Sequence, residues 1–338
     1  MPMSKGTMTE VLIEGVREHR AVQAWLQVQS DPWEPGSLEV LQRRRYSTVY
    51  RLSQAEQDAA RVIAKRCRTA TARIEYTIYK TILPLTGLPA LHCYGVVEES
   101  EGEFCWLFLE DAAGVRYSPQ LSQHRELAAC WLAKTQLAAA STGLEACLPA
   151  RELDHYLGLL RGSRNTLLYH LAGSALPVED GTVFRRVAAH IDLIESLWKE
   201  IERICDLVPR TLVHGDFVNK NLRIRETATS PALLVFDWEF AGWGVPAADL
   251  AQFTDRAASP DLSLYWSTLN REHAGLDLRG IQAVAACGNL LRLVDQVSWA
   301  TTGQESVPPE HLVKAAALLR SYEASIVGAL NTFQRSRT

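Results

Sequence analysis

The chain is 338 residues long, which exceeds the usual size of a single hydrophobic core and predicts two lobes or domains. Apolar residues make up 47% and charged residues 22%, values that exclude a disordered chain. With 35 basic and 39 acidic side chains the formal net charge is −4, so the charge gives no reason to expect nucleic acid or an anionic membrane as a partner.

We expect a cytoplasmic protein without a signal peptide or a membrane span. Residues 1–10 lack a basic and then apolar pattern, and no apolar run reaches the length needed to cross a bilayer. The seven cysteines are odd in number, scattered, and include no C-x-x-C pair. Several lie among apolar neighbours, as Cys105 does, so buried free thiols in a reducing compartment are expected rather than a disulfide framework or a zinc site.

The first third of the chain carries both strand and helix patterns. Apolar residues near helical spacing predict a helix from Val11 to Trp25 that ends before the prolines at 32 and 35. The elements expected next are strands over 38–44, 48–52 and 60–67, a helix over 70–82, and strands over 90–97 and 103–109. This order predicts a compact, β-rich lobe of residues 1–109.

Beyond a hinge at residues 110–114, helical patterns dominate. The long helices expected there cover 123–140, 184–205, 280–300 and 309–333. Short apolar runs of strand length lie between the second and third of these helices, at 211–213, 222–224 and 233–236. Residues 115–338 are therefore expected to form a larger, mostly helical lobe, and the fold class is α+β.

Three side chains that carry oxygen follow the short strands. Asp216 and Asn221 lie in the loop after the first strand, and Asp237 follows the third. Mg²⁺ takes one or two carboxylates and amide oxygens from a protein, while phosphate oxygens and water complete its octahedron. This pattern favours a site for phosphoryl transfer, which also needs a residue that orients the attacking hydroxyl.

A cation for the phosphates of the nucleotide is available on the predicted strand 60–67. Lys65 ends the apolar run Val62-Ile63-Ala64, and Glu75 on the following helix is the natural counter-ion for a strand lysine. The alternatives are a solubilising lysine on an edge strand and an ordinary exposed glutamate on a helix.

These residues resemble the aminoglycoside phosphotransferase and choline kinase family. The resemblance rests on His-Gly-Asp at 214–216 with Asn221, on Asp-Trp-Glu at 237–239, and on Ala-Asp-Leu-Ala at 248–251. It implies a bilobal protein-kinase-like fold with ATP and Mg²⁺ as cofactors. The roles that it implies are the catalytic base for Asp216, Mg²⁺ ligands for Asn221 and Asp237, the α/β-phosphate contact for Lys65, its partner for Glu75, the adenine edge for the backbone from Leu109 to Asp111, and a brace of the catalytic loop for Asp249.

Two features depart from protein kinases. The hairpin at residues 44–50 has no glycine where protein kinases carry a glycine-rich loop, so Ser47 and Thr48 are either phosphate contacts or plain hairpin residues. Gly215 stands where protein kinases have the arginine that answers a phosphorylated activation loop. This difference indicates a constitutively assembled site and argues against a protein substrate. We expect His214 to be structural rather than catalytic.

The acceptor side is expected on the predicted helix 280–300, where Arg292, Asp295 and Trp299 share a stripe with Gly288. The resemblance implies that this region lines the acceptor pocket, and the alternative is an Arg292–Asp295 pair on a solvated face. From Trp243 onward acidic and basic residues nearly balance, which favours a neutral or singly charged acceptor over a polycationic aminoglycoside.

We therefore expect a small-molecule kinase that transfers the γ-phosphoryl group of ATP to a hydroxyl of a metabolite or an antibiotic. The alternative is a nucleotide-binding pseudokinase with a regulatory or scaffold role, which the hairpin without glycine favours and the intact polar positions oppose. A P-loop kinase is disfavoured because no G-x-x-x-x-G-K-[ST] motif occurs. The identity of the acceptor, the choice between ATP and GTP, and the oligomeric state stay open.

Overall fold

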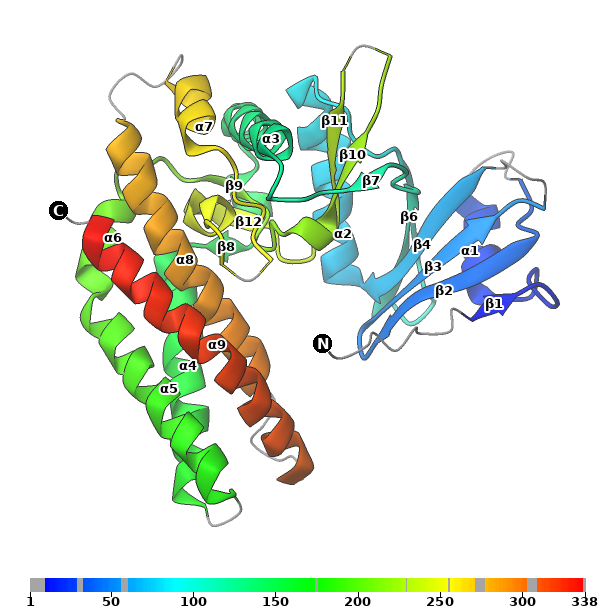
Figure 1. Ribbon diagram of the computed structural model, residues 1–338. Helices are drawn as coiled ribbons and strands as arrows, with labels where there is room; N and C mark the ends of the chain where they lie inside the picture. The colour runs from blue at the N-terminus through cyan, green and yellow to red at the C-terminus, as the bar shows by residue number, and fades with distance from the viewer. Residues whose placement is uncertain are drawn as a thin grey trace. The chain divides into compact units, whose positions relative to one another are not determined.

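The structure is a computed structural model, and it divides into two compact units (Figure 1). The residues that it describes are 10–28, 33–55, 60–173, 176–228, 230–254, 256–270, 277–302 and 309–336. The first unit is Met1–Val115 with Arg223–Glu239, and the second is Arg116–Leu222 with Phe240–Thr338. Residues 223–239, which the sequence analysis placed in the larger lobe, thus group with the first unit.

A six-stranded antiparallel sheet forms the body of the first unit, in the order β1-β2-β3-β4-β6-β5. Its strands are β1 (Val11–Leu12), β2 (Ser37–Arg44), β3 (Ser47–Ser53), β4 (Arg61–Arg68), β5 (Cys93–Glu98) and β6 (Phe104–Glu110). The five longer strands confirm the predicted ones to within three residues at each end. One face of the sheet, with Leu38, Leu52, Val62 and Phe108, packs on a helix, whereas β6 is buried along most of its length.

That helix is α1 (Arg20–Val28), whose Trp25 is fully buried and lies 5.5 Å from the ring of Phe108. The prediction of a helix beginning at Val11 was wrong. Residues 11 and 12 pair with β2 instead, and Gly15 at φ 65° interrupts any helix before α1. Helix α2 (Thr69–Thr77) follows β4 directly and continues into a π-helical segment, Ile78–Ile82. The predicted helix 70–82 is confirmed.

The second unit is mostly helical (Figure 1). Its helices are α3 (Ser122–Ala140), α4 (Leu153–Ala172), α5 (Val178–Ser196), α6 (Trp198–Cys205), α7 (Leu262–Leu269), α8 (Leu278–Thr301) and α9 (Pro309–Ser336). Helices α3, α8 and α9 confirm three predictions. The single helix predicted over 184–205 is two helices that meet at Leu197, and α4 and α7 were not predicted. The expected α+β organisation is confirmed.

Short strands border the loops that contain the candidate site residues Asp216, Asn221 and Asp237. They are β7 (Val115–Arg116), β8 (Ala150–Arg151), β9 (Thr211–Val213), β10 (Leu222–Arg225), β11 (Ala232–Val235) and β12 (Gly242–Gly244). They form two three-stranded sheets, in the orders β11-β10-β7 and β8-β12-β9. The three predicted short runs correspond to β9, β10 and β11, and all three are largely buried.

Helix α8 is the buried axis of the second unit. It contacts α4, α9 and the 3₁₀ helix η5 (Pro246–Leu250), and in Figure 1 it runs beside α9 and α4. A Cβ atom on Gly288 would lie 1.8 Å from the carbonyl oxygen of Ala247, so only glycine allows α8 to approach η5 this closely. This approach brings the middle of α8 next to the segment that contains Asp249.

All seven cysteines are free thiols; five are buried, Cys130 is half-buried and Cys147 is exposed. Among the described helices, none is long and apolar enough to cross a membrane.

Candidate functional site

In the first unit, Lys65 is held between two carboxylates. Its side chain is only 7% exposed, and its Nζ donates to Glu75 Oε1 at 2.6 Å and to Asp237 Oδ1 at 2.5 Å. Glu75, on α2, is completely buried. A buried ammonium is tolerated only when its charge is matched and its protons are bonded, which both contacts provide. The structure thus places Lys65 in neither an edge strand nor a solvated position.

The charges of this cluster fix the protonation of the lysine. Burial by itself would lower the pKa of Lys65, but the negative charges of Glu75, Asp237 and Glu239 raise that pKa well above its ordinary value. Burial also raises the pKa of the Glu75 carboxyl to about 7, against the opposing effect of Lys65. Lys65 therefore stays a cation at neutral pH and can meet an anion such as a phosphate.

Asp237 adopts a strained backbone conformation just after β11. Its φ is 67°, in the left-handed region that aspartate and asparagine tolerate better than other residues with a side chain. Such conformations persist where the surroundings impose them, often at functional sites. Two residues later, Glu239 forms an ion pair with Arg44 at 3.3 Å. Neither Arg44 nor Glu239 was singled out in the sequence, although Glu239 belongs to the Asp-Trp-Glu segment.

The register of the hairpin β2–β3 separates the two candidate phosphate contacts. Ser47 pairs with Cys67 and Thr48 pairs with Arg66 across β4. Directly opposed residues share a face of the sheet, and residues two apart along a strand share it as well. Ser47 is therefore on the face that carries Lys65, whereas the Thr48 side chain is on the opposite face. Only the backbone of Thr48 is available to a ligand bound on the lysine side.

The segment after β6 is tied to the sheet by an ion pair. Leu109 is buried and pairs with Ile63 of β4. The Asp111 carboxylate accepts a hydrogen bond from Arg51 Nε at 2.7 Å, and Arg51 Nη1 also binds Glu39 at 2.6 Å. The Asp111 side chain thus holds this segment against β3, and the Asp111 carbonyl oxygen accepts a hydrogen bond from the backbone N–H of Ala113 at 2.8 Å.

In the second unit, hydrogen bonds to the Asp249 carboxylate hold the loop after β9. The backbone N–H groups of His214 and Gly215 donate to the Asp249 carboxylate at 2.6 and 3.0 Å. Burial raises the pKa of Asp249 to about 6, and the two N–H donors oppose that rise. Gly215 has φ 75°, and a Cβ there would lie 2.3 Å from the carbonyl oxygen of Phe240. An arginine at this position would not fit, which is a physical reason for the departure from protein kinases.

His214 lies in the same loop and is 1% exposed. Its Nδ1 accepts a hydrogen bond from the backbone N–H of Asp216 at 3.2 Å. This contact shapes the turn that presents Asp216, as a structural histidine would.

Both oxygens of Asp216 are engaged. Oδ1 accepts from Arg292 Nη2 at 3.0 Å, and Oδ2 accepts from Asn221 Nδ2 at 3.1 Å and lies 2.9 Å from Lys220 Nζ. Burial would raise the pKa of Asp216, but Arg292 and Lys220 outweigh it and lower that pKa below the ordinary value. Asp216 is therefore an ionised carboxylate held in one orientation. The amide nitrogen of Asn221 faces Asp216, so its amide oxygen is directed elsewhere.

The two charged residues of the α8 stripe, Arg292 and Asp295, are not on a solvated face. Arg292 is 3% exposed and Asp295 is 7% exposed, whereas Trp299 is 43% exposed. The Trp299 ring lies 5.4 Å from that of Phe240 and 5.7 Å from the Arg292 guanidinium carbon. Burial raises the pKa of Asp295 to about 7, although Arg292 and Arg151 oppose the rise. The stripe predicted from spacing thus combines two buried charges with one exposed aromatic ring.

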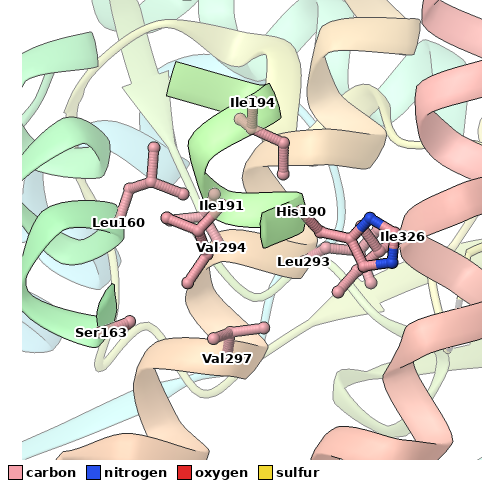
Figure 2. Close-up of a pocket in the computed structure, with 9 residues that line it drawn as sticks. All are labelled: Leu160, Ser163, His190, Ile191, Ile194, Leu293, Val294, Val297 and Ile326. Carbon is pink, nitrogen blue, oxygen red and sulfur yellow. The ribbon is translucent and has the colours of Figure 1, made fainter. Parts of the chain in front are cut away.

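The opposite face of α8 lines a small cavity with α4, α5 and α9, which Figure 2 shows with its side chains. Leu293, Val294 and Val297 of α8 line the cavity. The lining residues with polar side chains are Ser163 and His190. About 10 Å³ is open to the centre of a water molecule, barely enough for one water. This cavity is a packing gap and not a ligand site.

Asp237 of the first unit and Asn221 of the second each carry an oxygen of a kind that Mg²⁺ binds. In the ranges that the structure describes, no group of three or more His, Cys, Asp or Glu side chains could hold a metal ion. Mg²⁺ does not need such a group, because phosphate oxygens and water supply most of its ligands. One carboxylate, from Asp237, and one amide oxygen, from Asn221, are the kinds of protein ligand that it takes.

Comparison with known proteins agrees with the fold and the motifs. A profile of the phosphotransferase enzyme family matches residues 38–287, and the chain belongs to this family. The match includes Lys65, Glu75, Asp216 and Asp237, and it ends before Arg292. No curated protein matches the sequence.

Several solved structures share the fold at low sequence identity. Spectinomycin phosphotransferase, solved with ADP and spectinomycin, has a TM-score of 0.60 and 10% identity over 89% of this chain and 94% of its own. Aminoglycoside 2'-phosphotransferase-IIIa with GDP has a TM-score of 0.59 and 12% identity over 86% and 93%. Ethanolamine kinase from Plasmodium vivax has a TM-score of 0.53 and 11% identity over 85% and 82%. The protein-kinase-like fold is thereby confirmed.

The raised pKa of Asp295 predicts a pH-dependent stability. Because its pKa is about 7 when folded and 3.8 ordinarily, the folded state binds this proton more tightly. The proton on Asp295 stabilises the folded state fully below pH 4. This contribution to the free energy of unfolding, up to about 4 kcal/mol, is lost as pH rises through 7. Asp295→Asn removes the titration. We expect the free energy of unfolding of the wild type, relative to this variant, to fall between pH 4 and 7.5 in urea titrations. A difference that stays constant over that range would contradict the assignment.

Proposed function

We propose that this protein transfers the γ-phosphoryl group of ATP, with Mg²⁺, to a hydroxyl group of a small molecule. The observation that carries the proposal is the bonding of Lys65 to both Glu75 and Asp237. A buried, protonated lysine beside a carboxylate at the end of a strand suits the phosphates of a nucleotide and their metal ion. The spectinomycin and 2'-phosphotransferase relatives were solved with ADP and GDP, which supports a purine nucleotide as the donor.

In this proposal the first unit handles the nucleotide. Lys65 binds oxygens of the α- and β-phosphates, and Glu75 keeps its side chain in place. Ser47 is the hairpin hydroxyl on the same face of the sheet, and the backbone from Leu109 to Asp111 binds the edge of the base. When bound, Mg²⁺ neutralises charge on the phosphates, and Asp237 and Asn221 are its proposed protein ligands.

The second unit handles the acceptor. Asp216 accepts a hydrogen bond from the attacking hydroxyl, aims its oxygen at the phosphorus and takes its proton. A carboxylate with a lowered pKa is a weak base, so its main contribution is orientation, and the proton leaves late in the transfer. Asp249 holds the N–H groups of the loop and acts through Asp216.

The acceptor is proposed to be neutral or singly charged. Trp299, exposed beside Phe240, offers a flat surface on which a sugar or a heteroaromatic ring can stack. Asp295 and Arg292 are buried charges of opposite sign on α8. The helix face that they share with Trp299 therefore lacks the excess of carboxylates that a polycation needs. Nucleoside-like, glycosylated or macrocyclic alcohols fit this description.

A pseudokinase with a regulatory or scaffold role is the second candidate. It is favoured by the hairpin turn Arg45-Tyr46, which contains no glycine. Release of ADP in the following experiments separates the two candidates, because a pseudokinase would bind nucleotide without turnover.

Asp216→Asn is predicted to lower kcat by roughly 10²–10⁴, the usual contribution of a positioned base. Nucleotide affinity should stay near that of the wild type, because Asp216 contacts the acceptor. The assay is coupled ADP release from Mg·ATP or Mg·GTP with spectinomycin, kanamycin, ethanolamine, choline and a set of nucleosides and glycosides. Asp154→Asn, an exposed aspartate of the same unit, is the matched control. Near-normal turnover of Asp216→Asn would remove this residue from the mechanism.

Asp237→Asn is predicted to abolish Mg²⁺-dependent turnover while leaving the fold intact. Asparagine tolerates the left-handed conformation at this position, so the substitution removes charge without new backbone strain. Activity is measured against Mg²⁺ concentration, and thermal unfolding provides the control for folding. An unchanged Mg²⁺ dependence in the variant would show that Asp237 is not a metal ligand.

The acceptor KM is predicted to change little between low and moderate salt at saturating nucleotide. Stacking and hydrogen bonding are weakly screened, whereas capture of a polycation weakens markedly as salt rises. Trp299→Ala should raise the acceptor KM and leave the nucleotide KM unchanged. Efficient phosphorylation of kanamycin with a steep rise of KM in salt is the result that would rule out a neutral acceptor.

A further inference from the structure

Arg292 contacts the catalytic loop at two points with one planar group. Its Nη1 donates to the carbonyl oxygen of Gly215 at 2.9 Å, and its Nη2 donates to Asp216 Oδ1 at 3.0 Å. The first bond fixes the guanidinium on the backbone of the loop, and the second fixes the carboxylate relative to that backbone. Because the guanidinium is planar and its Nη1 is bonded to the backbone, the single bond from Nη2 to the carboxylate has a defined direction.

The other cation on Asp216 cannot do the same. Lys220 lies 2.9 Å from Oδ2, but its side chain is 39% exposed. A lysine ammonium is a single point of contact on a flexible chain and is strongly hydrated when exposed. Arg292, in contrast, is 3% exposed, and two of its five N–H groups bond the loop, so it presents almost no surface to an acceptor.

The backbone of α8 is placed so that Arg292 reaches the loop. Gly288 lies one helical turn before Arg292, and the two residues share a face of the helix. The missing side chain of Gly288 lets α8 touch the carbonyl oxygen of Ala247 in η5. The same short helix supplies Asp249, which holds the N–H groups of the loop. Helix η5 thus bonds the N–H groups of the loop, and α8 bonds a carbonyl oxygen and a carboxylate of the same loop.

We propose that Arg292 is the positioning residue that fixes the orientation of the Asp216 carboxylate, and that Gly288 sets its reach. The inference rests on the proposed function, because it gives Arg292 a role in the step that Asp216 performs. It replaces the expectation that Arg292 binds the acceptor. Arg292 acts through Asp216 and contacts neither substrate.

The test compares Arg292→Lys, Arg292→Gln and Gly288→Ala in the full chain, with the ADP-release assay and the acceptors named above. Misplacement of a reacting group by about 1 Å costs about 10²-fold in rate, so we expect kcat to fall by about 10²-fold in Arg292→Gln. Arg292→Lys should recover only part of this loss. The KM values for nucleotide and acceptor should change less than threefold. Added guanidinium should raise kcat of Arg292→Gln at least several-fold at a concentration that leaves the wild type unaffected, and urea should not.

Arg320→Gln is the matched control. Arg320 of α9 forms an arginine–aspartate pair with Asp180 of α5 at 3.0 Å in the same unit. It should keep the wild-type kcat. A kcat of Arg292→Gln within twofold of the wild type, or a loss confined to the acceptor KM, would overturn the positioning role. Gly288→Ala should resemble Arg292→Gln in kcat if it folds, and a normal kcat in a folded Gly288→Ala would overturn the role of that glycine.

A second measurement does not need activity. Melting temperatures of Asp216→Asn, Arg292→Gln and the double variant report whether the two residues are coupled. We expect the double variant to lose less than the two single losses combined, and simple additivity would overturn the pair. Absence of ADP release by the wild type would instead overturn the proposed function, and coupling would then identify a structural pair without a catalytic role.

Discussion

A buried ammonium that must be neutralised organises the first unit. Lys65 sits on a central strand with almost no contact with water, and it is tolerated there because Glu75 and Asp237 both bond it. Glu75 comes from α2, 10 positions along the chain, and Asp237 lies just after β11, 172 positions away, so one cation ties a distant segment to β4 and α2. If one carboxylate is removed, the other still bonds the ammonium. In the proposed function, the phosphates of the nucleotide are the anions that this lysine binds.

The second unit contains a buried anion, where the first contains a buried cation. Asp216 is a buried anion, and Arg292, Lys220 and Asn221 supply its donors, while Asp249 satisfies the backbone N–H groups beneath it. The loop therefore has little freedom before any ligand arrives. Preorganisation of this kind lowers the cost of aligning an attacking oxygen with a phosphorus atom. It also fits a site that needs no phosphorylated segment to assemble it, because Gly215 leaves no room for the arginine that would read one.

Local sequence patterns pointed to several candidate site residues, and they missed the contacts whose two partners are remote in sequence. Asp216, Asn221 and Asp237 follow apolar runs of strand length, and Lys65 ends another, so spacing alone pointed to them. The pairs Arg44–Glu239 and Arg292–Asp216 join residues 195 and 76 positions apart, and no local pattern indicates such partners. Thr48 and Ser47 could not be separated without the register of β3 on β4. Helix α4 was missed although its buried residues have helical spacing, because two glycines interrupt its pattern.

The most direct measurement follows the transferred group itself. Wild-type protein is incubated with Mg²⁺, ATP labelled with ³²P at the γ position, and the acceptor that gives the largest release of ADP. The labelled product is then separated by chromatography and identified by mass spectrometry. We predict a phosphate monoester of the acceptor that carries the label for the wild type and for Asp154→Asn, and none for Asp216→Asn. Label that stays in ATP, or that appears only as inorganic phosphate with every acceptor, would contradict phosphoryl transfer to a hydroxyl.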